Sequence, residues 1–87
     1  MDRIHLLLVD SDGGRWEHMV SSIILPTPSG YLGILANHAP MLCAVCSGRL
    51  TCRFGEGESL GILISDGIAS VSDNEVTLLL SQMKTED

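Results

Sequence analysis

The stretch that decides the fold of this 87-residue chain is SGYLGILANHAPML, residues 29–42. A turn at Ser29 and Gly30 opens it, a short apolar run follows, and a loop leads into a second apolar run. Pro40 fixes its own φ angle and pushes Ala39 toward an extended conformation, so the loop has one stiff exit. Gly30 and Gly33 supply backbone freedom or room for close approach. The stretch therefore predicts two short strands joined by a rigid loop.

Apolar runs and turn residues alternate over the rest of the chain. The clearest example is residues 48–54, where Leu50, Cys52 and Phe54 are predicted to point inward. No window shows a capped apolar stripe with helical spacing. We predict an all-β, two-sheet antiparallel β-sandwich of about eight to ten short strands, forming one domain over residues 1–87. The expected strands are Ile4 to Val9, Met19 to Leu25, Tyr31 to Ile34, Met41 to Val45, Gly48 to Phe54, Leu60 to Ser65, Ile68 to Ser72 and Val76 to Leu80.

The composition limits the possible partners and compartments. Five basic residues stand against eleven acidic ones, and a net charge of −6 argues against binding to nucleic acid or to an anionic membrane. No apolar run approaches the roughly 18 residues of a transmembrane helix. No signal segment is expected before the first strand, so the chain is predicted to be cytosolic. Aromatic residues make up only 3% of the chain, so the core must be aliphatic.

Three cysteines suggest either packing residues or half of a zinc site. Cys43 and Cys46 have the spacing of a zinc knuckle, and Cys52 with His38 would complete four ligands. The odd number argues against a disulfide framework. Alternation places Cys52 in the core, and no second Cys-x-x-Cys pair is present. We predict that the cysteines are packing residues and keep structural zinc as the alternative.

The sequence offers no convergent set of catalytic groups. His5 is expected in a strand, His18 in a polar connection, and His38 has no acidic partner nearby in the sequence. The glycines lack phosphate-loop spacing, and Asp10 with Asp12 is an incomplete calcium loop. We therefore predict no catalysis, no cofactor, no metal and no small-molecule substrate.

Three strands are continuously apolar instead of alternating. Since side chains alternate across a strand, residues 23–25, 62–64 and 78–80 must place aliphatic groups on both faces of their sheets. Burial by a loop would explain one such run. Three in so small a domain favour an outer surface that contacts another protein.

The segment Gly-Tyr-Leu-Gly-Ile, followed by His-Ala-Pro and two apolar residues, resembles the N-terminal β-sandwich domain of the epsilon subunit of F-type ATP synthases. The likeness covers nearly the whole chain in order, which makes it more specific than any one motif. The other matching segments are Ile4-His5-Leu6, Gly48-Arg49-Leu50, Ser65 to Val71 and Asn74 to Leu79.

The resemblance implies a non-catalytic subunit of the rotor of a proton- or sodium-translocating ATP synthase. Such a subunit links the gamma subunit to the membrane c-ring and couples ion flow to ATP synthesis or hydrolysis. It implies a peripheral position at the cytoplasmic face of the bacterial inner membrane, without insertion into the bilayer. The alternative is a stand-alone small β-sandwich binding module with a structural zinc knuckle.

The resemblance also implies two sets of contact residues. The expected c-ring contact consists of Ser29, Gly30, Tyr31 and His38, and Tyr31 and His38 should be accessible to solvent. Family members often carry an acidic residue where this chain has Tyr31, so a phenol hydrogen bond would replace a salt bridge. The expected gamma-subunit contact consists of Asp10, Ser11, Met41, Leu42 and Cys43.

Family members usually continue into two C-terminal helices that can bind ATP or inhibit hydrolysis. By the resemblance those helices would start near Lys84 to Asp87. The inhibitory function is accordingly not expected of residues 1–87.

Overall fold

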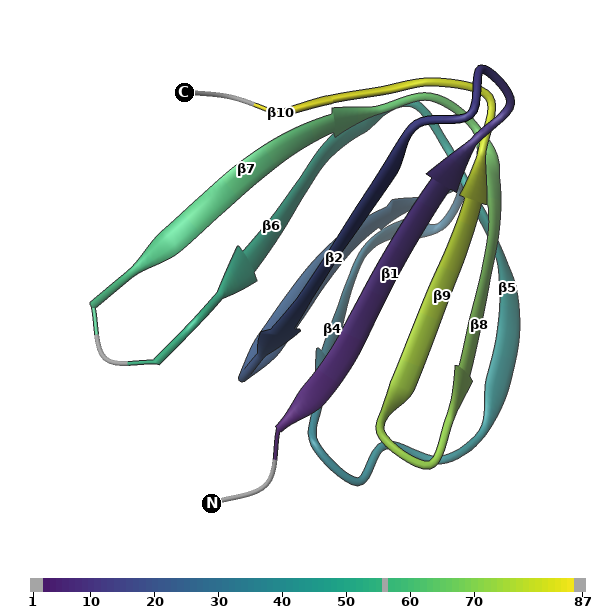
Figure 1. Cartoon of the computed structure of the whole chain (residues 1–87). Coiled ribbons are helices and arrows are strands. Elements are labelled where there is room, and N and C mark those ends of the chain that lie inside the picture. Colours follow the sequence, from purple (N-terminus) through teal and green to yellow (C-terminus); the bar gives the residue numbers. More distant parts are fainter. Residues whose placement is uncertain (1–2, 56, 86–87) are drawn as a thin grey trace.

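The computed structural model describes residues 3–55 and 57–85, which form ten strands (Figure 1). Glu56, between the expected strands Gly48 to Phe54 and Leu60 to Ser65, lies outside the described residues, as do residues 1, 2, 86 and 87. The strands are β1 (Ile4–Asp10), β2 (Arg15–Val20), β3 (Ser22–Thr27), β4 (Gly30–Leu35), β5 (Met41–Val45), β6 (Gly48–Arg53), β7 (Ser59–Ile64), β8 (Gly67–Ser72), β9 (Glu75–Leu80) and β10 (Met83–Thr85).

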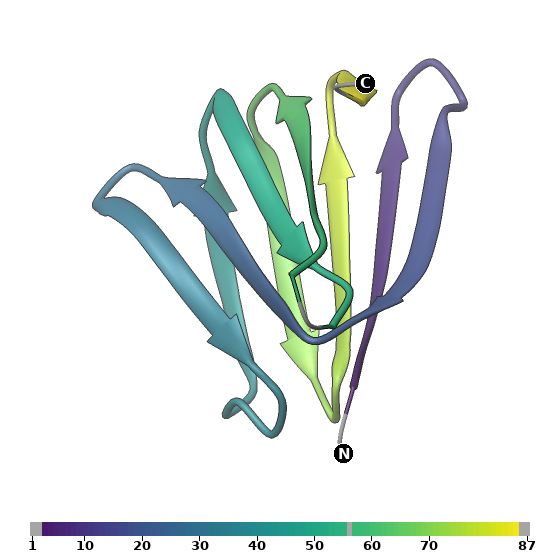
Figure 2. The ribbon, with the colours of Figure 1, turned by 90° about the vertical axis from the view of Figure 1, so that its left-hand side faces the viewer.

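The strands form two five-stranded sheets that pack as a sandwich (Figure 2). Sheet A has the order β2-β1-β9-β8-β5, and sheet B has the order β10-β7-β6-β3-β4. All neighbouring strands are antiparallel except β1 and β9, which pair in parallel. The predicted all-β sandwich is confirmed. In the described part of the chain, no helix is long and apolar enough to cross a membrane.

The prediction of one strand over residues 19–25 is wrong, because the chain forms two strands there. β2 and β3 are separated at Ser21, whose backbone N–H donates to the carbonyl of Arg53 over 2.7 Å. His18, predicted in a polar connection, lies in β2. β2 is an edge strand with mostly exposed residues, so its sequence lacks the clear apolar alternation of a half-buried strand. Lys84, predicted at the start of a helix, lies in the three-residue β10.

The turns gather at two ends of the sandwich. We call one the Asp66 end; it contains residues 11–14, 28–29, 46–47, 65–66 and 81–82. Its β1–β2, β7–β8 and β9–β10 connections lie at the top of Figure 1. The opposite one, the Asn74 end, contains the loop 36–40 and the turn at Asp73 and Asn74. Both turn residues have positive φ angles, 51° and 61°, which asparagine and aspartate tolerate better than most residues.

The core is aliphatic, as the composition predicts. Leu50 and Cys52 of β6 are fully buried, and burial raises the pKa of the Cys52 thiol to about 11. Phe54 is half-buried and packs with Trp16 and His18 at ring-centroid distances of 6.4 Å and 5.0 Å. Among the described residues no polar or charged side chain is buried. The predicted inward orientation of Leu50 and Cys52 is confirmed.

Gly67 lies where β8 runs too close to β9 for a side chain to fit. A Cβ atom at this position would lie 2.0 Å from the carbonyl oxygen of Leu79. Carbon and oxygen cannot approach so closely, so only glycine fits without moving the backbone of β9. The first residue of β8 must therefore be glycine for β8 to pair with β9 at this distance.

One polar cluster crosses three strands on the outer face of sheet A. Both ring nitrogens of His5 face carboxylates: Nε2 contacts Glu17 of β2, and Nδ1 lies 2.9 Å from Glu75 of β9. Arg15 also donates to Glu17, over 3.1 Å. The bond with Glu17 raises the pKa of His5, and the bond with His5 lowers the pKa of Glu17. The charged imidazolium, which donates from both nitrogens, is the form that this geometry favours.

We expect Leu50→Ala to destabilise the domain by about 2–5 kcal/mol, because it leaves a cavity in the closed core. The matched control is Leu63→Ala, which removes the same atoms from a side chain that is 45% exposed. This control should cost much less. Chemical denaturation of both variants measures the two costs, and equal losses would show that the assignment of inner and outer faces is wrong.

We expect the stability difference between the wild type and His5→Gln to depend on pH. The raised pKa of His5 contributes stability that is fully present below the ordinary histidine value of 6.5 and is lost as the pH rises through the folded-state pKa. The lowered pKa of Glu17 contributes stability that is present above 4.5 and is lost as the pH falls through its own folded-state pKa.

The stabilising effect of His5 should therefore be largest between about pH 4.5 and 6.5. Thermal unfolding of both proteins across this range measures it, and Glu17→Gln serves as the control because it removes the larger of the two hydrogen-bond effects. The same measurement is extended well below pH 4.5 and well above pH 6.5, where the stability difference should shrink. A difference that keeps its full size on both sides of this range would contradict the assigned cluster.

Candidate functional site

The turn at the Asp66 end between β3 and β4 presents Tyr31 to solvent. The Thr27 hydroxyl donates to the carbonyl of Gly30 over 2.5 Å and accepts from the Ser29 backbone N–H over 3.3 Å. Gly30 has a φ angle of +117°, which glycine adopts far more easily than other residues. Tyr31, the next residue, is 68% exposed. The predicted accessibility of Tyr31 is confirmed.

A shallow groove of about 430 Å³ lies beside this turn. It runs between the start of β4 and the middle of β5, which belong to different sheets. Backbone and small or apolar side chains form its walls, and no charged residue contributes. The lining residues are Thr27, Pro28, Ser29, Gly30, Tyr31, Leu32, Cys43 and Ala44.

His38 lies at the opposite, Asn74 end of the molecule. The backbone N–H of Asn37 donates to the side-chain oxygen of Asn74 over 2.6 Å, and the Asn74 amide donates to the Asn37 side-chain oxygen over 3.2 Å. This amide pair holds the loop 36–40 against the β8–β9 turn. His38 Nδ1 donates to the carbonyl of Ala39 over 2.7 Å. The ring is half-buried, so His38 is less accessible than we predict from the sequence.

The four residues of the expected c-ring contact therefore do not form one patch. Ser29, Gly30 and Tyr31 cluster at the start of β4, and His38 follows the end of this strand. A strand rises about 3.3 Å per residue, so the six residues of β4 separate the two groups by about 20 Å.

Asp10 and Ser11 hold the β1–β2 turn together. Asp10 Oδ1 accepts from the backbone N–H groups of Asp12 and Gly14, at 3.0 Å and 2.6 Å. The Ser11 hydroxyl donates to the carbonyl of Ser81 over 2.8 Å. These bonds give both residues a structural role within the chain.

The β5 residues of the expected gamma-subunit contact alternate between two faces. Met41 and Cys43 are half-buried and pack against the core, and Leu42 between them is 73% exposed on the outer face of sheet A. Asp10 and Ser11 belong to the other half of this sheet, since β8 and β9 separate β5 from β1. The five residues of the expected gamma-subunit contact therefore lie in three places. Leu42 is on the outer face, Met41 and Cys43 point inward, and Asp10 and Ser11 are in the distant β1–β2 turn.

An apolar row crosses the outer face of sheet A, and the sequence reasoning found only part of it. Strand register places Val9 beside Leu79, Leu79 beside Ile68, and Ile68 beside Ala44. Leu79 and Ile68 are 58% and 50% exposed. Of the four, only Leu79 belongs to one of the three apolar runs singled out in the sequence, residues 23–25, 62–64 and 78–80. The other members could have been found only by aligning the strands of the sheet. We call these four residues the apolar row.

The prediction that the three continuous apolar runs reach both faces is confirmed. The central residues of these runs are all partly exposed: Ile24 and Leu63 on sheet B, and Leu79 on sheet A.

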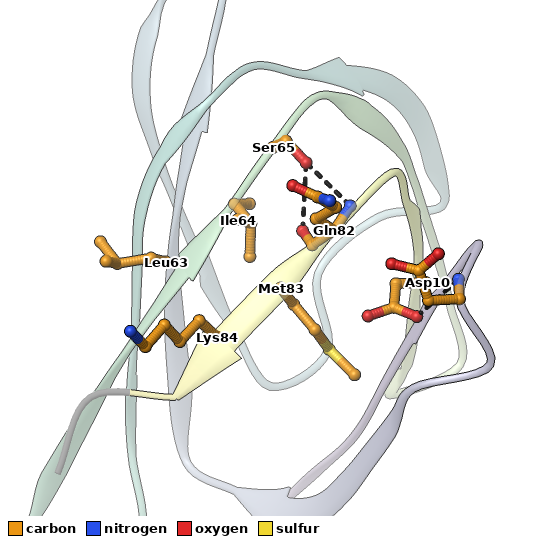
Figure 3. Close-up of a pocket in the computed structure, with 8 residues that line it drawn as sticks. Asp10, Leu63, Ile64, Ser65, Gln82, Met83 and Lys84 are labelled. Atoms are coloured by element: carbon orange, nitrogen blue, oxygen red, sulfur yellow. Dashed lines mark hydrogen bonds between the residues drawn. The ribbon is translucent and has the colours of Figure 1, made fainter.

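A second groove, of about 450 Å³, opens near β10 (Figure 3). The backbone N–H of Gln82 donates to the Ser65 hydroxyl over 2.8 Å, and this hydroxyl donates to the Gln82 carbonyl over 3.2 Å. Asp10 and Lys84 also line the groove. The polar groups shown join the segment before β10 to the end of β7 and do not form a nucleophile with its base.

The predicted zinc ligands are not brought together. Cys52 faces the core, the backbone N–H of Cys46 donates to the Pro26 carbonyl at the Asp66 end, and His38 lies at the Asn74 end. Over residues 3–55 and 57–85, no group of three or more histidine, cysteine, aspartate or glutamate side chains could hold a metal ion. The zinc-knuckle alternative gains no support from this arrangement.

The fold places the protein in the class of small two-sheet β-sandwiches. Its candidate contacts are exposed turns and the apolar row. Residues 3–86 match the family model described as the beta-sandwich domain of the ATP synthase delta/epsilon chain. The chain belongs to this family, as the sequence resemblance predicts.

Named relatives agree with the family match. The chain is 40% identical over 80 residues to the ATP synthase epsilon chain of Cyanothece sp., which covers 92% of this chain and 57% of the relative. It is 34% identical over 74 residues to the chloroplastic epsilon chain of Cyanidioschyzon merolae, covering 85% of this chain and 56% of the relative. The chain thus spans somewhat more than half the length of these relatives.

Solved structures share the fold. A chain in the cryo-EM structure of the Euglena gracilis mitochondrial ATP synthase superimposes with a TM-score of 0.86 at 26% identity, covering 95% of this chain and 53% of that one. A chain in the central stalk and c-ring structure of the Tetrahymena thermophila mitochondrial ATP synthase has a TM-score of 0.77 at 19% identity, covering 94% and 66%. The second likeness concerns the fold alone.

Proposed function

We propose that this domain is a non-catalytic part of the rotor of an F-type ATP synthase. It links the gamma subunit to the membrane c-ring and so couples proton or sodium flow to ATP synthesis or hydrolysis. The observation that carries the proposal is the family match over residues 3–86, in a fold that keeps its core closed and offers exposed contacts. The complex holds the domain at the cytoplasmic face of the bacterial inner membrane, as a peripheral protein.

The Ser29-to-Tyr31 turn is our proposed c-ring contact. It projects from one end of the sandwich, and Tyr31 carries both an apolar ring and a hydroxyl that can exchange hydrogen bonds. His38 follows the other end of β4, too far from Tyr31 to share one contact with it. We therefore assign His38 to a separate contact within the complex.

The proposed gamma-subunit contact centres on Leu42. This side chain is the most exposed large apolar residue of the described chain, and it lies on the outer face that also carries the apolar row. Burying such side chains gives about 25 cal/mol per Å² of apolar area, which favours association with a protein surface. Met41 and Cys43 support Leu42 from the core side, and Asp10 with Ser11 shapes the turn at the far side of the sheet.

We expect Tyr31→Ala to impair coupling without unfolding the domain. An exposed side chain outside caps and cores changes stability by less than about 0.5 kcal/mol. ATP-driven ion pumping should fall in membranes reconstituted with the variant subunit, and thermal unfolding of the variant should match that of the wild type. Tyr31→Phe keeps the ring and removes only the hydroxyl, so it separates the hydrogen bond from apolar contact.

The matched surface control is Leu63→Ala, on sheet B between β6 and β10. It should leave pumping unchanged. If Tyr31→Ala folds normally and pumps like the wild type, the turn is not the ring contact.

A further inference from the structure

Thirty consecutive residues of this acidic chain, 19–48, contain no aspartate, glutamate, lysine or arginine. The five basic and eleven acidic residues all lie outside this segment. It forms β3, β4, the loop 36–40 and β5. β4 ends sheet B and β5 ends sheet A, and the groove between them shows that these two edges lie on the same side of the sandwich. The two strands that form these edges therefore carry no formal charge.

The direction of the backbone groups on β4 follows from Pro26. Its carbonyl accepts from the N–H of Cys46, so the backbone of Pro26 points away from β4. Pro26 is paired with Tyr31, which makes this an antiparallel pair without mutual hydrogen bonds. The N–H and C=O groups of Tyr31 must then point away from β3, and alternation gives Gly33 and Leu35 the same direction. These three residues form the open edge of β4.

Two of the other three sheet edges in the described chain, β2 and β10, carry charged side chains, whereas β5 at the edge of sheet A carries none, like β4. β2 has Arg15 and Glu17, and the short β10 has Lys84. Charged residues and short strands are the usual protection of an edge against pairing with another chain. β4 has six residues without charge or proline. Its edge lacks the protection that β2 and β10 have.

The side chains beside the open edge are suited to contact with an added strand. Tyr31 and Leu35 are each 68% exposed. Between them, a Cβ atom added to Gly33 would have nothing within 4 Å, so the backbone there is open to close approach. The uncharged groove between β4 and β5 continues this surface toward sheet A.

We propose that β4 accepts an extended, uncharged segment of another rotor subunit as an additional strand of sheet B. The open edge supplies backbone hydrogen bonds, and Tyr31 and Leu35 cover the incoming side chains. A charged segment would be desolvated here without an opposite charge in residues 19–48 to pair with it, so the surface selects against one. The identity of the partner complex rests on the proposed function. The outward direction of the β4 backbone groups comes from the strand pairing alone and does not depend on that function.

Amide exchange provides the most direct test. The probe is the cognate ATP synthase complex from which the epsilon chain has been removed, mixed with the purified wild-type chain. Hydrogen–deuterium exchange resolved to single residues should show new protection at Tyr31, Gly33 and Leu35. Leu32 and Ile34, whose amides face β3, should be protected before and after binding. Binding without new protection at the three edge amides overturns the proposal.

Gly33→Pro and Gly33→Ala form a matched pair for the same question. Proline removes the outward N–H and leaves the ladder to β3 intact, whereas alanine keeps the donor and fits the open space. We expect Gly33→Pro to bind the depleted complex about tenfold more weakly, through the lost hydrogen bond and the blocked edge. Gly33→Ala should bind like the wild type. Leu35→Lys adds a charge to the edge and should also weaken binding. It replaces Gly33→Pro as the test variant if Gly33→Pro does not fold.

The outcomes separate the two proposals. If the wild type binds and Gly33→Pro and Leu35→Lys bind equally well, the strand-addition proposal is overturned and the rotor function stands. If the wild type does not bind the complex, the rotor function falls and the partner named here falls with it. If the isolated chain dimerises and protects the same amides, a second copy is the occupant and the proposal of a different partner is overturned.

Discussion

The parallel pairing of β1 with β9 is the constraint on which the arrangement of this domain depends. It brings the start of the chain beside the last long strand over six residue pairs, from His5 with Glu75 to Asp10 with Leu80. This register places His5 against its second carboxylate, and the Ser11 hydroxyl against Ser81. It also sets Leu79 beside Val9, which begins the apolar row. A different register would remove all of these contacts together.

Local patterns in the sequence were sufficient to predict most of the fold. Alternation at Leu50 and Cys52 identified inward side chains, and Gly30 and Pro40 identified a turn and a stiff loop between two strands. The boundary between β2 and β3 was missed because edge strands with exposed residues lack apolar alternation. β10 was missed because three residues are too few to show an alternation of apolar and polar side chains. Its pairing with β7 also depends on residues that are distant in the sequence.

The candidate contacts were less predictable because they depend on which strands become neighbours. Tyr31 and His38 are seven positions apart in the sequence, yet a strand places them at opposite ends of the sandwich. The apolar row unites residues from four strands, and no single segment of the sequence contains it. The direction of backbone groups on β4 required one hydrogen bond, from Cys46 to Pro26, that no residue pattern indicates.

The amide pair between Asn37 and Asn74 has a consequence for how the domain responds to acid. Neither side chain titrates, so the bonds that fix the loop 36–40 keep their strength while the His5 cluster gains or loses its proton. The two features are adjacent, because the Asn74 carbonyl also accepts from the His5 backbone N–H over 2.8 Å. A change of pH can therefore loosen the contacts of β2 and leave the crossing between the two sheets in place. The pH-dependent contacts of this domain are thus confined to the β2 edge of sheet A, and the loop that joins the two sheets is held by uncharged amides.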